Sequence, residues 1–305
     1  MLSYDKLAKK PATFRSFTGL EVSEFDSLYK RIEAGYAESE QKRLFREDRE
    51  RRVGWGGRPF RLPLKERLLA LLVYYRLYVT FTLAGFLFDV DQSTVYRDIR
   101  KLEPLGKECI PLPKKVYKKV SRRLRTMEEV ERYFPGFRAI IDSTEQEIPR
   151  PKNSKKRKTH YSGKKKRHTV KTQLTVNRDG LIIHKTSHAR GRRHDYDVFK
   201  RNHPALPEKV RPEIDLGYDG IQNDFPEMNP IIPFKRRRGK KLTEEQREHN
   251  RALSKTRVVV EHTISRLKKF NIMGQEFRNR LRHYDTMTDI ISGLVNFRIM
   301  GNAAL

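Results

Sequence analysis

The chain has 305 residues, of which 67 are Lys or Arg and 38 are Asp or Glu, so its formal charge at pH 7 is +29. A charge of this size repels itself unless a polyanion neutralises it, which disfavours an ordinary metabolic enzyme and favours a partner such as DNA or RNA, with a membrane surface as the weaker alternative. A single cysteine, Cys109, excludes a disulfide framework and zinc sites built from several cysteines. The longest uncharged apolar stretch, 77–88, is too short to span a bilayer and no signal-peptide pattern is present, so we expect no membrane segment and a cytoplasmic location.

The first part of the chain predicts helices. Residues 21–35 carry apolar side chains at spacings of three and four, the period of an amphipathic helix: Val22, Phe25, Leu28, Tyr29 and Ile32. The mostly charged residues 38–52 are expected to continue this helix on the surface, and the Gly- and Pro-rich run 54–59 is expected to end it.

Three helices are predicted between residues 63 and 102. A buried helix with proline in its first turn begins at Pro63, a two-turn helix covers 80–88, a turn follows at 89–91, and a third helix covers 92–102. This pattern is typical of a helix-turn-helix, whose second helix enters the major groove with its exposed N-terminal side chains. The candidate base-reading residues, all donors or acceptors, are Gln92, Ser93, Thr94, Tyr96 and Arg97. The alternative is a plain helical bundle whose polar face carries these residues.

The character of the chain then changes from helix to strand. Residues 114–125 contain seven basic residues in twelve and are interpreted as a linker or a basic arm, and Thr126 and Glu129 fit a capping box that opens a short helix. Strands are predicted at 137–141, 170–176, 181–183, up to Ile214 and at 231–234, with 170–176 and 181–183 forming a hairpin. Helices are predicted at 194–201, 243–271 and 284–299. This order describes an α/β layer fold.

Two basic stretches lie in this second part. Residues 150–168 contain ten Lys or Arg and no acid, and residues 235–241 contain six basic residues in seven. Together with the overall charge they predict phosphate-contacting surfaces, which supply affinity without sequence information. Lys164, Lys165 and Lys166 are the candidates we single out. The alternative is a pair of solvated loops.

Two aspartates follow apolar strand patterns. Asp142 comes directly after 137–141 and is expected at the carboxyl end of a buried strand, where α/β folds place their sites. Asp215 likewise follows an apolar strand pattern, which ends at Ile214, and it is followed by Leu216 and Gly217. Two such acids on neighbouring strands would repel each other, and a divalent cation with hard oxygen ligands, magnesium or manganese, relieves that repulsion.

A third acid lies on a predicted helix. Arg257, Glu261 and Lys268 share one face beside an apolar stripe, so Glu261 is a candidate third metal ligand, and Arg257 and Lys268 are candidates to grip phosphates. The alternative is an exposed Arg–Glu pair on a solvated face.

With these motifs the chain resembles the DDE transposases of prokaryotic insertion sequences, in the group related to the Harbinger superfamily. The matching motifs are the helix-turn-helix region at 62–106, Asp142-Ser143-Thr144, His194-Asp195, Asp215-Leu216-Gly217-Tyr218 and Arg257-x3-Glu261-x6-Lys268. The sequence departs from the usual pattern at Ser143, Leu216 and Ser254, none of which is a candidate ligand.

The resemblance implies a ribonuclease-H-like catalytic domain, with a mixed sheet flanked by helices, after a helical DNA-binding domain. It divides the chain into an N-terminal helical region (1–60), a helix-turn-helix domain (61–110), a basic linker with a short helix (111–135) and the catalytic domain (136–305). It implies that Asp142, Asp215 and Glu261 bind two Mg²⁺ (or Mn²⁺) ions, with His194 and Asp195 as possible supporting residues.

The function implied is metal-dependent cleavage of double-stranded DNA at terminal inverted repeats, followed by strand transfer into target DNA. We expect such a protein to work as a homo-oligomer on DNA, in the cytoplasm at the nucleoid of a prokaryote. A DNA-binding regulator or a domesticated nuclease derived from a transposase is the principal alternative. A basic RNA-associated protein is a second one, which explains the charge but not the three acids.

Overall fold

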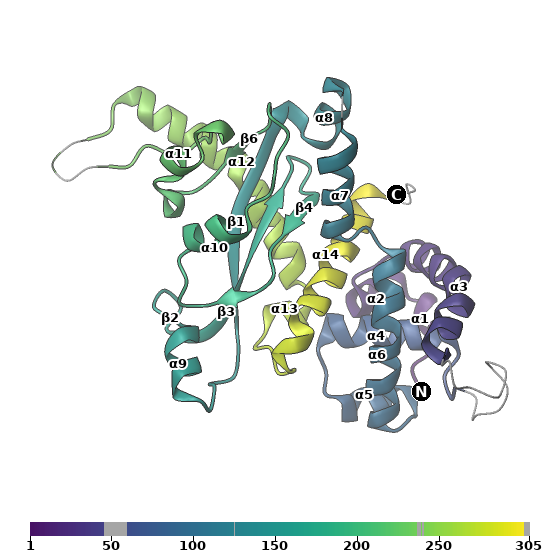
Figure 1. Ribbon diagram of the computed structural model, residues 1–305. Helices are drawn as coiled ribbons and strands as arrows, with labels where there is room; N and C mark the ends of the chain where they lie inside the picture. The colour runs from purple at the N-terminus through teal and green to yellow at the C-terminus, as the bar shows by residue number, and fades with distance from the viewer. Residues whose placement is uncertain (46–59, 125, 237–238, 240, 302–305) are drawn as a thin grey trace. The chain divides into compact units, whose positions relative to one another are not determined.

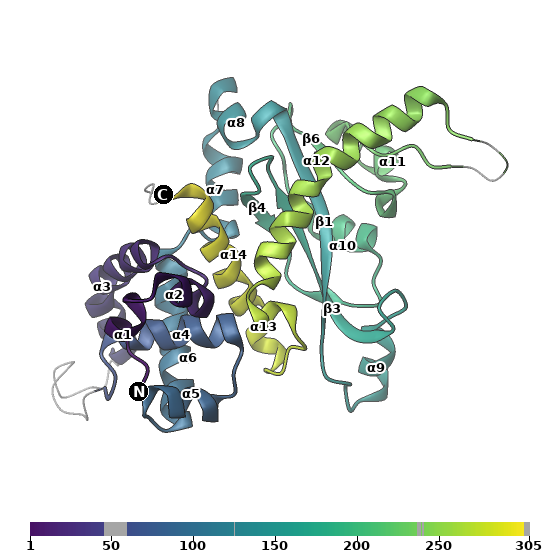
Figure 2. The same ribbon diagram turned by 180° about the vertical axis from the view of Figure 1, so that it is seen from behind.

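The computed structural model describes residues 1–45, 60–124, 126–236, 239 and 241–301 (Figures 1 and 2). The chain forms two compact units. The first contains the described part of 1–111 with 269–272 and 300–301, and the second contains the described part of 112–268 with 273–299. No helix in the described part of the chain is long and apolar enough to cross a membrane.

The first unit is helical. Its helices are α1 (Tyr4–Ala8), α2 (Pro11–Thr18), α3 (Val22–Leu44), α4 (Leu64–Leu77), α5 (Phe81–Phe88) and α6 (Gln92–Cys109). The helix predicted at 21–35 is confirmed, with a reciprocal Glu21–Glu24 capping box at its start, and its charged continuation is confirmed as far as Leu44. The remainder of that continuation and the break predicted at 54–59 lie outside the described residues.

The three helices predicted between residues 63 and 102 are confirmed as α4, α5 and α6. Pro63 is the N-cap of α4 and not a residue of its first turn. The side chain of Thr80 caps α5 by accepting from Leu83 N, and Asp91 caps α6 by accepting from Ser93 N. Helix α6 runs further than predicted, through Pro104, because Leu102 and Leu105 remain buried.

The turn between α5 and α6 depends on one glycine. A side chain at Gly85 would place its Cβ 2.6 Å from the carbonyl oxygen of Val90, so the chain folds back this closely only with glycine there. Asp89 adopts a left-handed conformation (φ 55°) and ends α5. This close pairing of two short helices presents the start of α6 to solvent.

One expectation about the second unit is wrong. Most of the basic stretch 114–125, interpreted as a linker or arm, forms helix α7 (Pro113–Arg123), and Arg125 lies outside the described residues. Val116 and Val120, four residues apart, are both buried, and α7 packs against strand β4 (Ile182–Lys185). Its apolar stripe therefore outweighs the charge repulsion along the helix. Helix α8 (Met127–Tyr133) follows with the predicted Thr126–Glu129 capping box.

A mixed sheet forms the centre of the second unit. Its other strands are β1 (Arg138–Glu147), β2 (Tyr161–Ser162), β3 (Arg167–Val176), β5 (Ala189–Arg190) and β6 (Arg211–Glu213). The order is β2-β3-β1-β6, and β4 and β5 also pair with β3. Strand β6 runs parallel to β1, and the other pairings are antiparallel.

The predicted β3–β4 hairpin is confirmed, with Gly180 at φ 82° in its turn. Residues 231–234 were expected to form a strand, but only a single bridge joins Ile231 to Glu213. Pro233 has no N–H to extend that pairing.

Helices flank the sheet. They are α9 (Ser154–His160), α10 (Asp195–Asn202), α11 (Ile221–Asp224), α12 (Glu244–Lys268), α13 (Asn271–Gly274) and α14 (Tyr284–Met300), with 3-10 turns at Pro135–Phe137, Leu216–Tyr218, Pro226–Met228 and Leu281–His283. Helix α12 lies along β1 on the side seen in Figure 2. On the opposite face Phe199 of α10 packs with Ile141 of β1, Ile214 and Tyr218 in one buried cluster.

Candidate active site

Asp142 lies in the middle of β1 and not at its end. Strand β1 was expected to stop at residue 141, but it continues to Glu147 because β3 pairs with it as far as Glu147 and Thr169. Side chains alternate along a strand, so Ile141 enters the cluster with Phe199 while Asp142 faces the other side of the sheet, where α12 lies.

The parallel pairing of β1 and β6 brings Asp215 beside Asp142. The pairing ends where Ile140 meets Glu213, and Asp142 and Asp215 each follow two residues later, within electrostatic range of each other. Ile141 and Ile214 are both fully buried in one cluster, which directs the following aspartates to the opposite face. Each aspartate accepts a hydrogen bond of 2.7 Å from the next backbone N–H.

The two carboxylates share the positive charge of Arg257 on α12. Its Nη1 lies 3.5 Å from Oδ1 of Asp215. Burial raises the pKa of Asp142, the Ser143 N–H and Arg257 oppose this, and the negative charges of Asp195 and Asp215 raise the pKa further. Arg257, expected to grip phosphate, therefore also offsets the repulsion within the acidic pair.

Glu261 lies one helical turn after Arg257 on α12. It is exposed, whereas Val260, Thr263 and Leu267 are buried. Within the described ranges, no three Asp, Glu, His or Cys side chains lie close enough together to hold a metal ion. The assignment of Glu261 as a third ligand therefore stays a prediction, which its position one turn from Arg257 on a helix contacting β1 supports.

The acidic pair has the chemistry of a divalent-cation site. Its donors are hard carboxylate oxygens that repel each other, and burial raises the pKa of Asp142, an effect that a bound cation would oppose. Asp142 and Asp215 therefore fit Mg²⁺ or Mn²⁺.

Lys268, at the end of α12, is partly buried. Burial lowers its pKa and the charge of Lys165 lowers it further, while the carboxylates of Glu145 and Asp142 act in the opposite direction. These interactions place its ammonium group within electrostatic range of Asp142. The arrangement favours the phosphate-gripping role over the solvated alternative.

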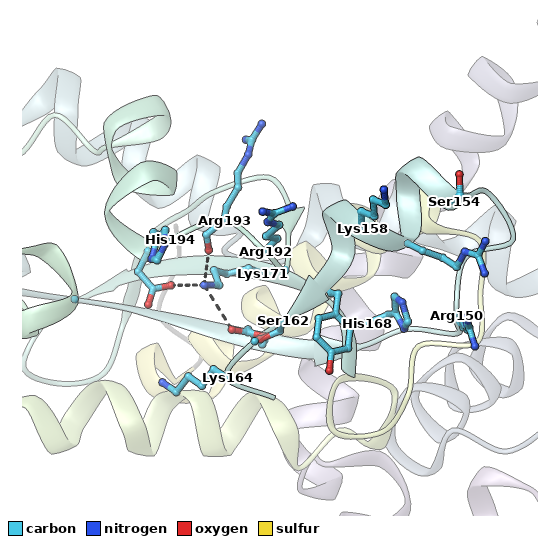
Figure 3. Close-up of a pocket in the computed structure, with 17 residues that line it drawn as sticks. Arg150, Ser154, Lys158, Ser162, Lys164, His168, Lys171, Arg192, Arg193 and His194 are labelled. Carbon is cyan, nitrogen blue, oxygen red and sulfur yellow. Dashed lines mark hydrogen bonds and ion pairs between the residues drawn. The ribbon is translucent and has the colours of Figure 1, made fainter. Parts of the chain in front are cut away.

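Asp195 belongs to a buried charge network that sequence reasoning missed. Lys171 Nζ lies 2.8 Å from Oδ1 of Asp195 and 3.5 Å from Oε1 of Glu145, and it donates to the carbonyl oxygen of Arg193 at 2.7 Å (Figure 3). The alternation of 170–176 predicts a polar face for Lys171, but α10 and its preceding loop cover that face. His194, the N-cap of α10, is exposed and makes no side-chain cap hydrogen bond.

The face of the sheet that carries Lys171 also carries a second polar chain. Gln173 Nε2 donates to the hydroxyl of Tyr218 at 2.7 Å, and that hydroxyl lies 3.2 Å from Oγ of Ser143. Ser143 and Tyr218 each follow a candidate aspartate within three residues. This chain therefore fixes the backbone on which Asp142 and Asp215 sit.

The candidate DNA-reading residues lie at the start of α6 in the first unit. Gln92, Ser93, Tyr96 and Arg97 are exposed, and Thr94 is partly exposed. Arg97 donates to the carbonyl and the hydroxyl of Ser93, which holds its guanidinium near the N-terminus of the helix. These residues are accessible to a groove, as a recognition helix requires.

The candidate lysines of the second unit lie in the turn between β2 and β3. Lys164, Lys165 and Lys166 are all exposed, and Lys166 adopts a left-handed conformation (φ 54°). The backbone N–H of Lys166 donates to the carbonyl oxygen of Ser162 at 2.8 Å and closes the turn. Their side chains are free to contact a polyanion.

Comparisons with known proteins identify the family of the chain. Residues 141–296 match the family described as DDE superfamily endonuclease, and residues 60–112 match the helix-turn-helix of the same superfamily. The chain is 34% identical over 245 residues to a probable transposase for insertion sequence element IS702 of Microchaete diplosiphon, covering 80% of this chain and 83% of the relative. It is 24% identical over 270 residues to a putative transposase for insertion sequence element IS112 of Streptomyces albus G, covering 87% of each chain.

No solved structure matches the chain. The endonuclease match spans β1 to α14, and the helix-turn-helix match spans α4 to α6. The chain therefore belongs to the DDE superfamily endonucleases and, among them, to the transposases of insertion sequences.

Proposed function

We propose that this transposase cleaves double-stranded DNA at the terminal inverted repeats of an insertion sequence and transfers the freed strand into target DNA, with Asp142, Asp215 and Glu261 as the ligands of two Mg²⁺ (or Mn²⁺) ions. The observation that carries the proposal is the parallel β1–β6 register, which sets Asp142 beside Asp215 on the face next to α12. The names of the two relatives support the same reaction class.

The chemistry is an exchange of phosphodiester bonds. Water attacks phosphorus at the end of the element and the bond to the 3′-oxygen breaks, which leaves a free 3′-hydroxyl. That hydroxyl attacks a phosphodiester of the target, forms a new bond and displaces the target's own 3′-oxygen, so no external energy source is needed. Divalent cations supply positive charge to the attacking and leaving oxygens of such displacements.

The side chains around the acids have distinct roles in this proposal. Arg257 neutralises Asp215 and faces the incoming phosphate, and Lys268 holds a neighbouring phosphate so that the strand lies in line for attack. Asp195 supports the site through Lys171, and His194 precedes it at the start of α10. The start of α6 reads the terminal repeat, and Lys164, Lys165 and Lys166 contact phosphates without regard to sequence.

The proposed domains are 1–60, 61–110, 111–135 and 136–305. The proposed working form is a homo-oligomer bound to DNA at the nucleoid. Two element ends must be cut and joined together, which one active site per chain cannot do simultaneously. A DNA-binding regulator is the second candidate, since the exposed α6 start and the charge of +29 would suit it equally.

The test uses the DNA that flanks the gene. Short inverted repeats found there supply a labelled duplex, which is incubated with the protein and Mg²⁺, with Mn²⁺ or with a chelator. We expect nicking at the repeat end in either metal, no nicking with chelator, and covalent joining of the labelled 3′ end to a supercoiled plasmid. Specific binding without cleavage in any divalent cation would contradict the proposal and favour the regulator.

A further inference from the structure

A large cavity lies in the second unit beside the candidate active site. Its volume is about 1020 Å³, and α9, the β2–β3 turn and the loop before α10 form its walls. Glu145, Lys171 and Asp195 line it, as does Gly217, two residues after Asp215 (Figure 3). Glu145 is three residues beyond Asp142 on β1 and points to the opposite face of the strand, the face that α10 covers. Asp195 in the cavity lies within electrostatic range of Asp142, so the cavity is near the acidic pair.

The cavity is strongly basic. Seven Lys or Arg side chains line it against two carboxylates, those of Glu145 and Asp195. Lys171 is paired with both carboxylates and offsets the charge of one of them. No ion pair within the described part of the chain holds the other six cations: Arg150, Arg157, Lys158, Lys164, Arg192 and Arg193. A polyanion is the ligand that complements such a lining.

An aromatic side chain is placed among these cations. Tyr161 lines the cavity with 43% of its surface exposed. It pairs directly with His168 across the β2–β3 ladder, and the two rings pack edge to face with their centroids 5.6 Å apart. The ladder and the histidine hold the tyrosine ring in place. Single-strand binding sites combine two features: cationic side chains along the nucleic-acid backbone, and a fixed aromatic ring on which a base stacks.

The shape of the site separates unpaired DNA from a duplex. A duplex keeps the faces of its bases stacked on one another and offers a protein only base edges and the sugar-phosphate backbone, so a tyrosine ring has no base face to stack on. A base reaches such a ring only after it has left the stack. Gly191 in the lining has no room for a side chain, because a Cβ there would lie 1.9 Å from Oγ1 of Thr169.

We propose that this cavity binds unpaired nucleotides of the DNA strand next to the cleavage site, with a base stacked on Tyr161 and phosphates on the surrounding Lys and Arg side chains. The inference rests on the proposed function, because it identifies the strand in the cavity as part of the same DNA substrate. Opening of the duplex at the element end then exposes the scissile phosphate to Asp142 and Asp215.

The experiment measures metal-free binding, so that its result does not depend on cleavage. A fluorescently labelled oligothymidylate of about 12 nucleotides, within the usual range of single-strand sites, is titrated with the full chain in chelator and followed by anisotropy. A duplex of the same length is measured in parallel. Tyr161→Ala is compared with wild type, with Tyr161→Trp and with a matched control.

Phe234→Ala is the matched control. Phe234 is 45% exposed in the same unit, packs edge to face against His249 at 5.0 Å between centroids, and does not line the cavity. Both aromatic residues therefore present a ring held by a histidine near basic residues. Circular dichroism and the thermal midpoint of each variant establish that it is folded.

We expect Tyr161→Ala to weaken oligothymidylate binding about 5- to 100-fold, as removal of one stacking partner does, and to change duplex binding less than about twofold. Tyr161→Trp should retain single-strand binding, and Phe234→Ala should match wild type. Equal losses for single strand and duplex, an equal loss in Phe234→Ala, or tighter binding of an oligouridylate than of oligothymidylate would overturn the inference. Absence of metal-dependent cleavage would overturn the proposed function alone.

Discussion

At the scale of single residues, the alternation of one strand decides which side chains face α12. Ile141 and Asp142 are neighbours, yet one is buried against Phe199 and the other faces α12. The sequence supports the choice of Asp142 and Asp215, because each follows a buried isoleucine. It does not place Asp142 mid-strand, since the length of β1 depends on pairing with β3 more than 20 residues later.

Lys268 gives a prediction at this scale. Lys268→Ala should retain metal binding but slow cleavage on the order of 10- to 100-fold, because a misplaced strand loses its in-line geometry. Lys268→Arg should recover part of the rate, since it restores the positive charge. Cleavage of the labelled repeat end and calorimetric Mg²⁺ titration measure the two effects. Lys269→Ala, the exposed neighbour, is the control, and wild-type cleavage by Lys268→Ala would remove Lys268 from the site.

His184 on β4 predicts a pH dependence of stability. Its burial lowers its pKa to about 4 from the ordinary value of 6.5, with the charges of Lys185 and His203 as smaller causes. Above pH 6.5 the ring is neutral whether the chain is folded or unfolded. Between pH 6.5 and about 4 only the unfolded chain takes up the proton. The free energy of unfolding therefore decreases as the pH is lowered through this range, by at most about 3 kcal/mol.

Urea unfolding at pH 7 and pH 5 tests this contribution. We expect His184→Gln to lose less stability between these two pH values than wild type loses. An equal loss in both proteins would show that the ring of His184, which packs 4.9 Å from Tyr117 between centroids, is not the group that titrates.

At the scale of elements, a buried ion pair joins the helices of the helix-turn-helix region. Arg67 of α4 is 1% exposed, and its Nε lies 3.4 Å from Oδ1 of Asp98 on α6. Burial raises the pKa of Asp98, and Arg67 opposes that effect. Sequence reasoning treated α4 as an apolar helix and missed this pair, because nothing local shows that two charged residues 31 positions apart are buried together.

Asp98→Ala should therefore destabilise the first unit by about 3–5 kcal/mol, because it leaves the guanidinium of Arg67 buried without a carboxylate. The double variant Arg67→Met with Asp98→Leu should lose much less, since neither charge remains. Urea unfolding of the full chain measures both. A smaller loss in Asp98→Ala than in the double variant would contradict this account of the pair.

Helix positions were easier to predict than the residues that each helix buries or covers. The capping box at Thr126 was predicted correctly because capping is a local interaction, and the helices expected at 80–88 and 92–102 begin directly after their caps Thr80 and Asp91. The helix within 114–125 was not predicted because its buried stripe contains only two apolar residues, Val116 and Val120, among many charged ones. Lys171 was missed for a similar reason: α10, which covers it, begins more than 20 residues later.

At the scale of the whole molecule, the positive charge is divided between surfaces with different expected tasks. Gln92→Ala or Arg97→Ala at the start of α6 should reduce discrimination between terminal-repeat and random DNA by about 1–3 kcal/mol, as removal of a hydrogen bond to a base edge does. Neutralising Lys164, Lys165 and Lys166 should weaken binding to all duplexes and flatten its salt dependence, by roughly 0.9 in log–log slope for each phosphate that is no longer neutralised.

Anisotropy titrations across a range of salt concentrations separate these effects. Sequence preference controlled by the three lysines, with α6 variants affecting all DNA equally, would reverse the proposed division. The charge alone predicted a nucleic-acid partner, but only the exposed start of α6 and the turn of β2 and β3 show where DNA would meet the protein.

The most direct test of the carboxylate site is the rate of Mg²⁺-dependent cleavage by its isosteric amide variants. Asp142→Asn, Asp215→Asn and Glu261→Gln preserve side-chain shape but remove the charge that holds a cation. Each should cut the labelled repeat end slower by about three orders of magnitude or more, since metal ligation contributes several kcal/mol to such displacements, while binding the duplex as wild type does. Asp219→Asn, an exposed carboxylate four residues after Asp215, should cut at the wild-type rate. Cleavage by Asp142→Asn and Asp215→Asn at the rate of that control would contradict the assignment.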